Sequence, residues 1–243
     1  MTATLRNGAL GIDVAVLQLR LNLASSPGPN LRVDGSFGPR TYAAVVAFQR
    51  KANLALDGIV GPQTHASLPS MSALSVASHA IQHIAQPTRT TCWAASTAMM
   101  TQTSVETVRA RTPAQMIASD GGLLNSSESN QAVVTGSRYG AVHSLYCHAP
   151  MSWSVGGLVN ALRRSPLMLD MLWNATDYVE GHRSPGHMIV VSAIVSNNAP
   201  DGKHTHVLVL DPWPPHRGKA SWVEYQRWTM ELPTRTYRVF ERR

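Results

Sequence analysis

Cys92 is the residue of this sequence whose type and position are best suited to covalent chemistry. It stands in Gln86-Pro-Thr-Arg-Thr-Thr-Cys-Trp-Ala-Ala-Ser, and the residues after it have the composition of a helix. A thiol at a helix N-terminus meets the positive end of the helix dipole, which favours the nucleophilic thiolate. Gln86 offers a side-chain amide that can donate a hydrogen bond to an oxyanion formed beside the sulfur. The alternative is a structural cysteine buried on an apolar helix.

A base for this thiol, and a residue to orient that base, lie further along the chain. His187 enters one apolar run, Asp211 leaves the next, and the turn-rich segment 197–202 between the runs predicts a β-hairpin. Paired strands can hold the two side chains side by side. We expect His187 to take the proton of Cys92 and Asp211 to fix the orientation of the imidazole. Their alternatives are a core histidine and a turn-forming aspartate before proline.

The elements that must position these residues are predicted to be one helix packed on an antiparallel sheet. Apolar periodicity predicts helices over 92–102 and 158–164. Apolar runs predict strands over 167–173, 188–195, 206–211 and near 236–240. The stretch 118–141 is rich in Gly, Ser and Asn and is predicted to be a loop.

An internal repeat marks a separate N-terminal domain. Residues 31–45 and 54–68 share the pattern Leu-x-apolar-Asp-Gly-x-apolar-Gly-Pro-x-Thr-x-Ala-x-apolar. In each copy Asp-Gly predicts a turn, and Gly-Pro-x-Thr leads into a helix with Pro in its first turn. An earlier helix is expected to bury Val14, Leu17, Leu21 and Leu23, and the helix between the copies to bury Ala43, Val46, Ala47 and Phe48.

The repeat and the residues upstream of it resemble a peptidoglycan-binding domain of the small three-helix type. The resemblance covers residues 5–68 and rests on Gly11, Val14, Leu17-Gln18, Leu21, Asp34-Gly35-x-Phe37-Gly38, Thr41, Val45, Phe48-Gln49, Leu54 and Asp57-Gly58-Ile59-Val60-Gly61-Pro62. It implies a wall-binding domain over 1–68, with a linker over 69–79. The candidate binding residues are Asp34, Gly35, Phe37, Asp57 and Gly58, each of which can instead shape turns and core.

The segments around Cys92, His187 and Asp211 resemble the papain-like cysteine peptidases found among bacterial secreted effectors. The resemblance implies an α+β fold over 80–243, with these three residues as the catalytic set and Gln86 as the oxyanion donor. Plant papains have Asn where this chain has Asp211, and either side chain can accept the imidazole N–H.

Two tryptophans belong to the same resemblance. Trp213 follows Asp211 closely and resembles the papain tryptophan that shields the bond between the histidine and its orienting residue. Trp93 directly follows Cys92. Both are candidate substrate-binding residues, and both can instead serve packing alone.

Composition narrows the classes of partner. The net charge of +7 is scattered without a basic stripe among aromatics, which argues against nucleic acid and suits anionic polymers such as cell wall. No apolar run is long enough for a membrane span, and two cysteines form no disulfide framework. His204-x-His206 lacks the further spacing of a zinc site, so we expect neither a metal nor another cofactor.

The sequence as a whole predicts a cell-wall-targeted cysteine hydrolase that cleaves amide or peptide bonds through a thioester at Cys92. Peptidoglycan and a protein or peptide substrate are its expected partners. The alternatives are a peptidoglycan amidase or endopeptidase with the same triad, and a non-catalytic wall-binding protein with a decayed peptidase domain. The N-terminus has no signal-peptide pattern. We therefore expect synthesis in the cytoplasm, non-classical export to the periplasm or wall of a target bacterium as an antibacterial effector, and an immunity protein.

Overall fold

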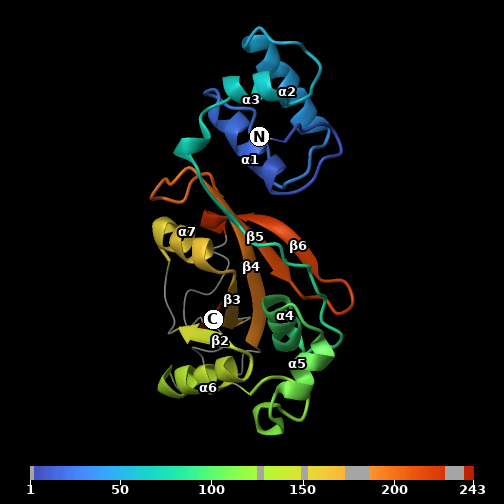
Figure 1. The fold of residues 1–243 in the computed structure, drawn as a ribbon, viewed down its shortest axis with the longest axis vertical. Coiled ribbons are helices and arrows are strands. Elements are labelled where there is room, and N and C mark those ends of the chain that lie inside the picture. Colours follow the sequence, from blue (N-terminus) through green and yellow to red (C-terminus); the bar gives the residue numbers. More distant parts are fainter. Residues whose placement is uncertain (1–2, 125–128, 149–152, 173–185, 228–237) are drawn as a thin grey trace.

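The computed structural model describes residues 3–124, 129–148, 153–172, 186–227 and 238–243, which form a helical first domain and a mixed second domain (Figure 1). The first domain contains α1 (Ile12–Leu23), α2 (Pro39–Lys51) and α3 (Pro62–Ser67). Among the described helices none has both the length and the apolar character to cross a bilayer.

The two copies of the repeat are held by the same pattern of hydrogen bonds from a buried glutamine. The amide of Gln18 in α1 donates to Oδ1 of Asp34 at 2.8 Å, and that of Gln49 in α2 donates to Oδ1 of Asp57, also at 2.8 Å. The carbonyl oxygen of each glutamine accepts the backbone N–H of the glycine that follows the aspartate, at 3.0 Å. A buried glutamine therefore fixes each Asp-Gly turn, and the repeat in the sequence is a repeat of turn architecture.

The buried face of α2 differs from the prediction. The structure buries Thr41, Ala44, Val45 and Gln49, whereas Ala43 and Ala47 are exposed and Val46 and Phe48 are half-buried. Phe48 packs against the core of the domain as predicted, and the prediction was wrong for Ala43 and Ala47 because it counted only apolar residues. Two polar residues of the buried face form hydrogen bonds inside the domain. Thr41 accepts from the amide of Gln18, and Gln49 donates to the carbonyl of Ile59 in the second turn.

The second domain is built on a seven-stranded antiparallel sheet in the described part of the chain, with β1 to β7 at Ser75–Ser78, Leu145–His148, Leu167–Leu172, Gly186–Ser196, Thr205–Asp211, Lys219–Glu224 and Arg238–Arg242. The strand order is β2-β7-β3-β4-β5-β6, with β1 pairing the later half of β4. Residues 75–78 thus form a strand inside the segment expected to be a linker, because the edge of β4 beyond the end of β3 offers them backbone partners.

Four helices surround this sheet: α4 (Cys92–Thr101), α5 (Val105–Arg111), α6 (Ser129–Val142) and α7 (Val155–Arg164). Helix α6 lies in the stretch that its glycine content predicted to be a loop. A Cβ on Gly140 would lie 2.7 Å from the carbonyl oxygen of Leu145, and one on Gly136 would lie 2.5 Å from the sulfur of Cys147. These glycines therefore allow α6 to approach β2 closely, and they do not mark turns.

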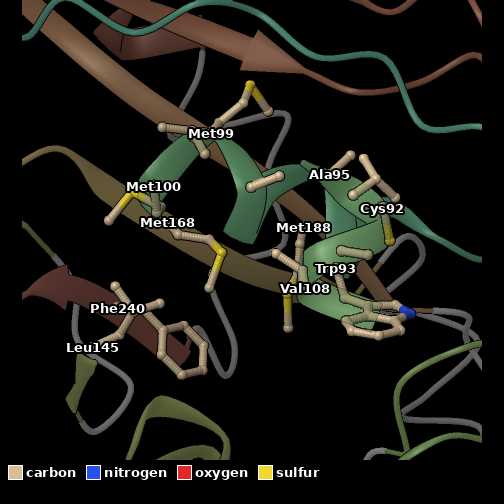
Figure 2. Packing of buried hydrophobic residues seen from close by; sticks show 14 of the residues in the cluster. Cys92, Trp93, Ala95, Met99, Met100, Val108, Leu145, Met168, Met188 and Phe240 are labelled. Atoms are coloured by element: carbon tan, nitrogen blue, oxygen red, sulfur yellow. The ribbon is translucent and has the colours of Figure 1, made fainter. Parts of the chain in front are cut away.

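A β-bulge in β4 determines which structures cover each face of the sheet. The register between β4 and β5 shifts between Val191 and Ala193, so the alternation of side chains changes by one residue. As a result Val190 packs under α4, and Ala193, three residues later, packs under α1 of the first domain. Helix α7 covers the opposite face, where it packs on Ile194 and its neighbours. Figure 2 shows the cluster beneath α4, with Cys92 at one end of it.

The two domains share a hydrophobic interface. Ala15, Val16 and Leu19 of α1 and Val33 pack against Ala193 and Val195 of β4 and Trp222 of β6. Trp222 is only 8% exposed, and a Cβ on Gly35 would lie 2.8 Å from its indole nitrogen. Gly35, whose φ is +69°, therefore serves both the turn of the first repeat and the close approach of the second domain.

Replacing Trp222 with alanine is expected to lower the free energy of unfolding by about 3 kcal/mol, because the variant loses a large buried side chain between the domains. Chemical denaturation followed by circular dichroism measures this loss. Leu10→Ala is the control, since Leu10 is 76% exposed and its truncation should change stability by less than about 0.5 kcal/mol. Equal effects of the two substitutions would show that Trp222 does not hold the interface.

Candidate active site

Cys92 is the first residue of α4, so its sulfur lies at the positive end of the helix dipole. Thr91 is the N-cap residue, and its side chain makes no capping hydrogen bond. The first turn of α4 contains no acidic residue that could compete with a thiolate for the free N–H groups. Cys92 is 8% exposed, at the edge of the cluster under α4. The local structure therefore favours negative charge at this sulfur.

The structure brings His187 and Asp211 together from neighbouring strands. His187 is the second residue of β4 and Asp211 the last of β5. Their Nε2 and Oδ1 atoms are 2.8 Å apart, with the imidazole buried and the carboxylate one-third exposed. The Cys92 thiol also forms a hydrogen bond with this imidazole. Because Nε2 is occupied by Asp211, we assign the Cys92 contact to the other ring nitrogen, Nδ1.

The pKa of His187 reflects two opposing causes. Burial disfavours the imidazolium, but the hydrogen bonds with Asp211 and Cys92, together with their charges, outweigh that effect and raise the pKa from 6.5 to about 9. At neutral pH the ring is therefore protonated in the resting enzyme. An imidazolium between a thiol and a carboxylate is the arrangement that stabilises a thiolate.

Asp211 is held in place by residues of its own loop and of the segment before Cys92. Its Oδ1 accepts the backbone N–H of Trp213 at 2.8 Å, which orients the carboxylate toward His187. The ring of His83 forms a hydrogen bond through Nε2 with the Asp211 carbonyl oxygen at 2.8 Å. His83 has no recognisable signal in the sequence, because its partner Asp211 lies 128 residues away.

The same loop also fixes Gln86. The backbone N–H of Gln86 donates to the Pro212 carbonyl at 3.0 Å, and the N–H of His216 donates to the Gln86 carbonyl at 2.9 Å. The side chain is fully buried, and its Nε2 donates to the Thr88 carbonyl at 2.6 Å. A primary amide carries two N–H donors, so one remains for an oxyanion. The role of Gln86 as oxyanion donor stays a prediction.

The two candidate tryptophans have different surroundings. Trp93 is 1% exposed, donates from Nε1 to the Gly121 carbonyl at 3.0 Å, and meets the ring of Tyr139 edge to face. This places Trp93 in the core instead of on a substrate-binding wall. Trp213 is half-buried, and its backbone N–H donates to Oδ1 of Asp211; its role as a shielding residue stays a prediction.

The candidate binding residues of the first domain have structural roles in this conformation. Asp34 and Asp57 accept hydrogen bonds from the buried glutamines, and Phe37 is 1% exposed. Gly35 faces Trp222, and Gly58 lies under the ring of Tyr42. Their contribution to ligand binding stays a prediction, and the contacts that the structure shows are those that shape the turns.

The described parts of the chain contain no cluster of side chains that could form a metal centre. No group of three or more His, Cys, Asp or Glu side chains gathers there in a way that could hold an ion.

A thiol at a helix N-terminus, facing an imidazole on an antiparallel sheet, is the architecture of the papain-like cysteine proteases. Residues 75–230 match the family described as papain-like cysteine protease AvrRpt2, and the chain belongs to this family. Residues 11–68 match a peptidoglycan binding domain. Both resemblances drawn from the sequence, and the α+β fold, are confirmed.

Two solved structures are similar to part of the chain. One is the crystal structure of a Burkholderia AP3 phage endolysin, with 42% identity and a TM-score of 0.25 over 26% of this chain and 24% of that one. The other is the SleB N-terminal domain, with 39% identity and a TM-score of 0.25 over 26% of this chain and 85% of that one. The match therefore spans about a quarter of the endolysin. No curated protein matches the chain.

Replacing Asp211 with asparagine is expected to lower the pKa of His187 from about 9 toward 6.5, because the variant loses the carboxylate charge beside the ring. NMR titration of the labelled imidazole measures this shift. In the wild type the protonated ring stabilises the fold fully below pH 6.5, and this contribution is lost as the pH rises through about 9. Asp201→Asn, at an exposed site, is the control. An unchanged His187 titration in Asp211→Asn would contradict the assignment.

Proposed function

We propose that this chain is a cysteine peptidase that cleaves amide bonds at the cell wall, with Cys92 as nucleophile, His187 as acid and base, and Asp211 as the residue that orients the imidazole. The observation that carries the proposal is the continuous contact from the Cys92 thiol through the imidazole to Asp211, at the N-terminus of a helix. Family membership supports the same chemistry.

The geometry supports a two-stage acyl transfer. In the resting ion pair, His187 holds the proton that Cys92 has given up, and the thiolate attacks the substrate carbonyl carbon. The oxyanion so formed accepts hydrogen bonds from the Cys92 backbone N–H and from Gln86. The imidazolium then passes its proton to the leaving amine as the C–N bond breaks, which leaves a thioester on the sulfur.

Hydrolysis of the thioester restores the site. The neutral imidazole takes a proton from a water molecule, and the resulting hydroxide attacks the thioester carbonyl. The C–S bond breaks, the carboxylic product leaves, and the thiolate and imidazolium are formed again. Asp211 keeps Nε2 protonated throughout, so that Nδ1 is the nitrogen that exchanges protons with sulfur, amine and water.

The first domain supports a location for this chemistry at the cell wall. A peptidoglycan-binding domain packs directly on the sheet that carries His187, through the interface around Trp222. A substrate near the wall is therefore presented to a site at a fixed distance from the binding domain. This arrangement favours the stem peptides of peptidoglycan, or proteins held close to them, as substrates. Export to a target bacterium and an immunity partner stay predictions from the sequence.

Digestion of purified peptidoglycan sacculi tests the substrate. The wild-type protein is expected to release stem-peptide fragments that carry new amino groups, and Cys92→Ala should lower the release by at least about 10³-fold because no thioester can form. Cys147→Ala is the matched control and should retain activity. Chromatography with mass spectrometry of the products identifies the cleaved bond. Cleavage of added proteins without any release from sacculi would instead assign a protein substrate.

Alkylation by iodoacetamide at pH 7 separates an active site from a decayed one without any substrate. Cys92 is expected to be labelled at least about tenfold faster than Cys147, because only Cys92 has an imidazolium partner. Burial raises the pKa of the Cys147 thiol to about 11, so it stays protonated. Peptide mass spectrometry measures both rates in the same sample. Equally slow labelling of the two cysteines would support a non-catalytic wall-binding protein.

A further inference from the structure

A cavity separate from the candidate active site lies at the end of α4 opposite to Cys92. It has a volume of about 370 Å³ and is formed where the end of α4 meets α5, the end of α6 and the end of β7. Helix α4 has ten residues, so the cavity is about 15 Å from the nucleophile at a rise of about 1.5 Å per residue. None of its lining residues belongs to the site described above.

The cavity is lined by positive charge. Three arginines are among its lining residues, Arg111 of α5 and Arg242 and Arg243 at the end of β7, and none of the described lining residues has an acidic side chain. The residue before Arg242 is Glu241, whose carboxylate lies 3.1 Å from Nη2 of Arg164 and 3.5 Å from Nε2 of His148. No acidic side chain among the described lining residues balances this charge, and the Met100 carbonyl at the end of α4 accepts one arginine N–H.

Arg242 is fixed in place with one donor nitrogen unused. Its Nε donates to the Met100 carbonyl at 2.6 Å, which closes the end of α4. Its Nη2 atom is buried and has no hydrogen-bond partner among the residues that the structure describes. A buried guanidinium nitrogen without an acceptor is costly. An anion in the cavity would supply the missing acceptor to a group whose orientation is already set.

Neighbouring side chains complete the lining. The Nε2 atom of His143 lies 2.9 Å from the Thr112 hydroxyl oxygen. Burial, with Arg111 adding to it, lowers the pKa of His143 to about 4, so the ring is neutral at pH 7. The guanidinium of Arg243 lies over the ring of Tyr146, 5.1 Å from its centre, which restricts its motion.

We propose that this cavity is a binding site for a phosphate-bearing anion. Guanidinium groups match the oxygens of phosphate with paired, charge-assisted hydrogen bonds, and three arginines line this cavity with no acidic side chain among the described lining residues. The site is separate from the active site and does not depend on peptidase activity.

Isothermal titration calorimetry with inorganic pyrophosphate at constant ionic strength tests the proposal on the full chain. We expect one-to-one binding by the wild type, weakened at least tenfold in Arg111→Gln/Arg243→Gln. This double variant leaves the Arg242 contact with Met100 in place, and its unfolding curve shows that it folds. The matched control is Arg50→Gln/Arg109→Gln, which removes the same charge from exposed positions outside the cavity and should bind within twofold of the wild type.

A second titration, with poly(glycerol phosphate), distinguishes the sources of the phosphate. Binding of the polymer with the same dependence on Arg111 and Arg243 would assign the site to phosphodiester polymers of the wall, and binding of pyrophosphate alone would assign it to small soluble phosphates. Either result supports the site. No binding of either probe, or equal weakening in the cavity variant and the control, would overturn it, because the affinity would then come only from the overall charge.

Discussion

The pairing of β4 with its neighbours is the constraint on which the rest of the structure depends. One end of β4 carries His187, and the bulge near Val191 turns the later half of the strand so that Ala193 and Val195 meet α1. A strand rises about 3.3 Å per residue, so His187 and Val195 of the interface between the domains are about 25 Å apart on one strand. The same strand therefore positions the candidate active site and the peptidoglycan-binding domain, and Figure 1 shows β4 running through the second domain toward the first.

The active site gathers residues from three segments, and the loop after β5 joins them. Asp211 ends β5 and contacts the imidazole, while the next residues bind the backbone of Gln86. Gln86 in turn belongs to the segment that leads into Cys92. Displacement of this loop would therefore affect the contact of Asp211 with His187 and the position of Gln86 together. The site acts as one unit because its parts share backbone hydrogen bonds, in addition to their side-chain contacts.

Arginines perform different tasks according to what surrounds them. Arg238 pairs with Asp170 in the interior, where both side chains are almost fully buried and the pair fixes β7 against β3. Arg242, four residues later on the same strand, closes the end of α4 and retains an unpaired nitrogen. One strand thus supplies a structural ion pair and, at its end, the positively charged cavity. The net charge of the chain does not show which arginine forms a structural ion pair and which one lines the cavity.

The sequence by itself determined both family resemblances, the α+β class and the main strands, and it predicted the candidate catalytic residues, because local patterns in the chain encode them. It misplaced the buried face of α2 because Thr41 and Gln49 bind the turns there, and it predicted a loop where α6 lies because the glycines of α6 serve close packing on β2. It overlooked His83 because the partner of this residue, Asp211, is 128 residues away. Only the tertiary structure decided that the domains share a core around Trp222 and that a positively charged cavity lies at the end of α4. Both features arise where separate elements meet, and packing between such elements leaves no periodic signal in either one.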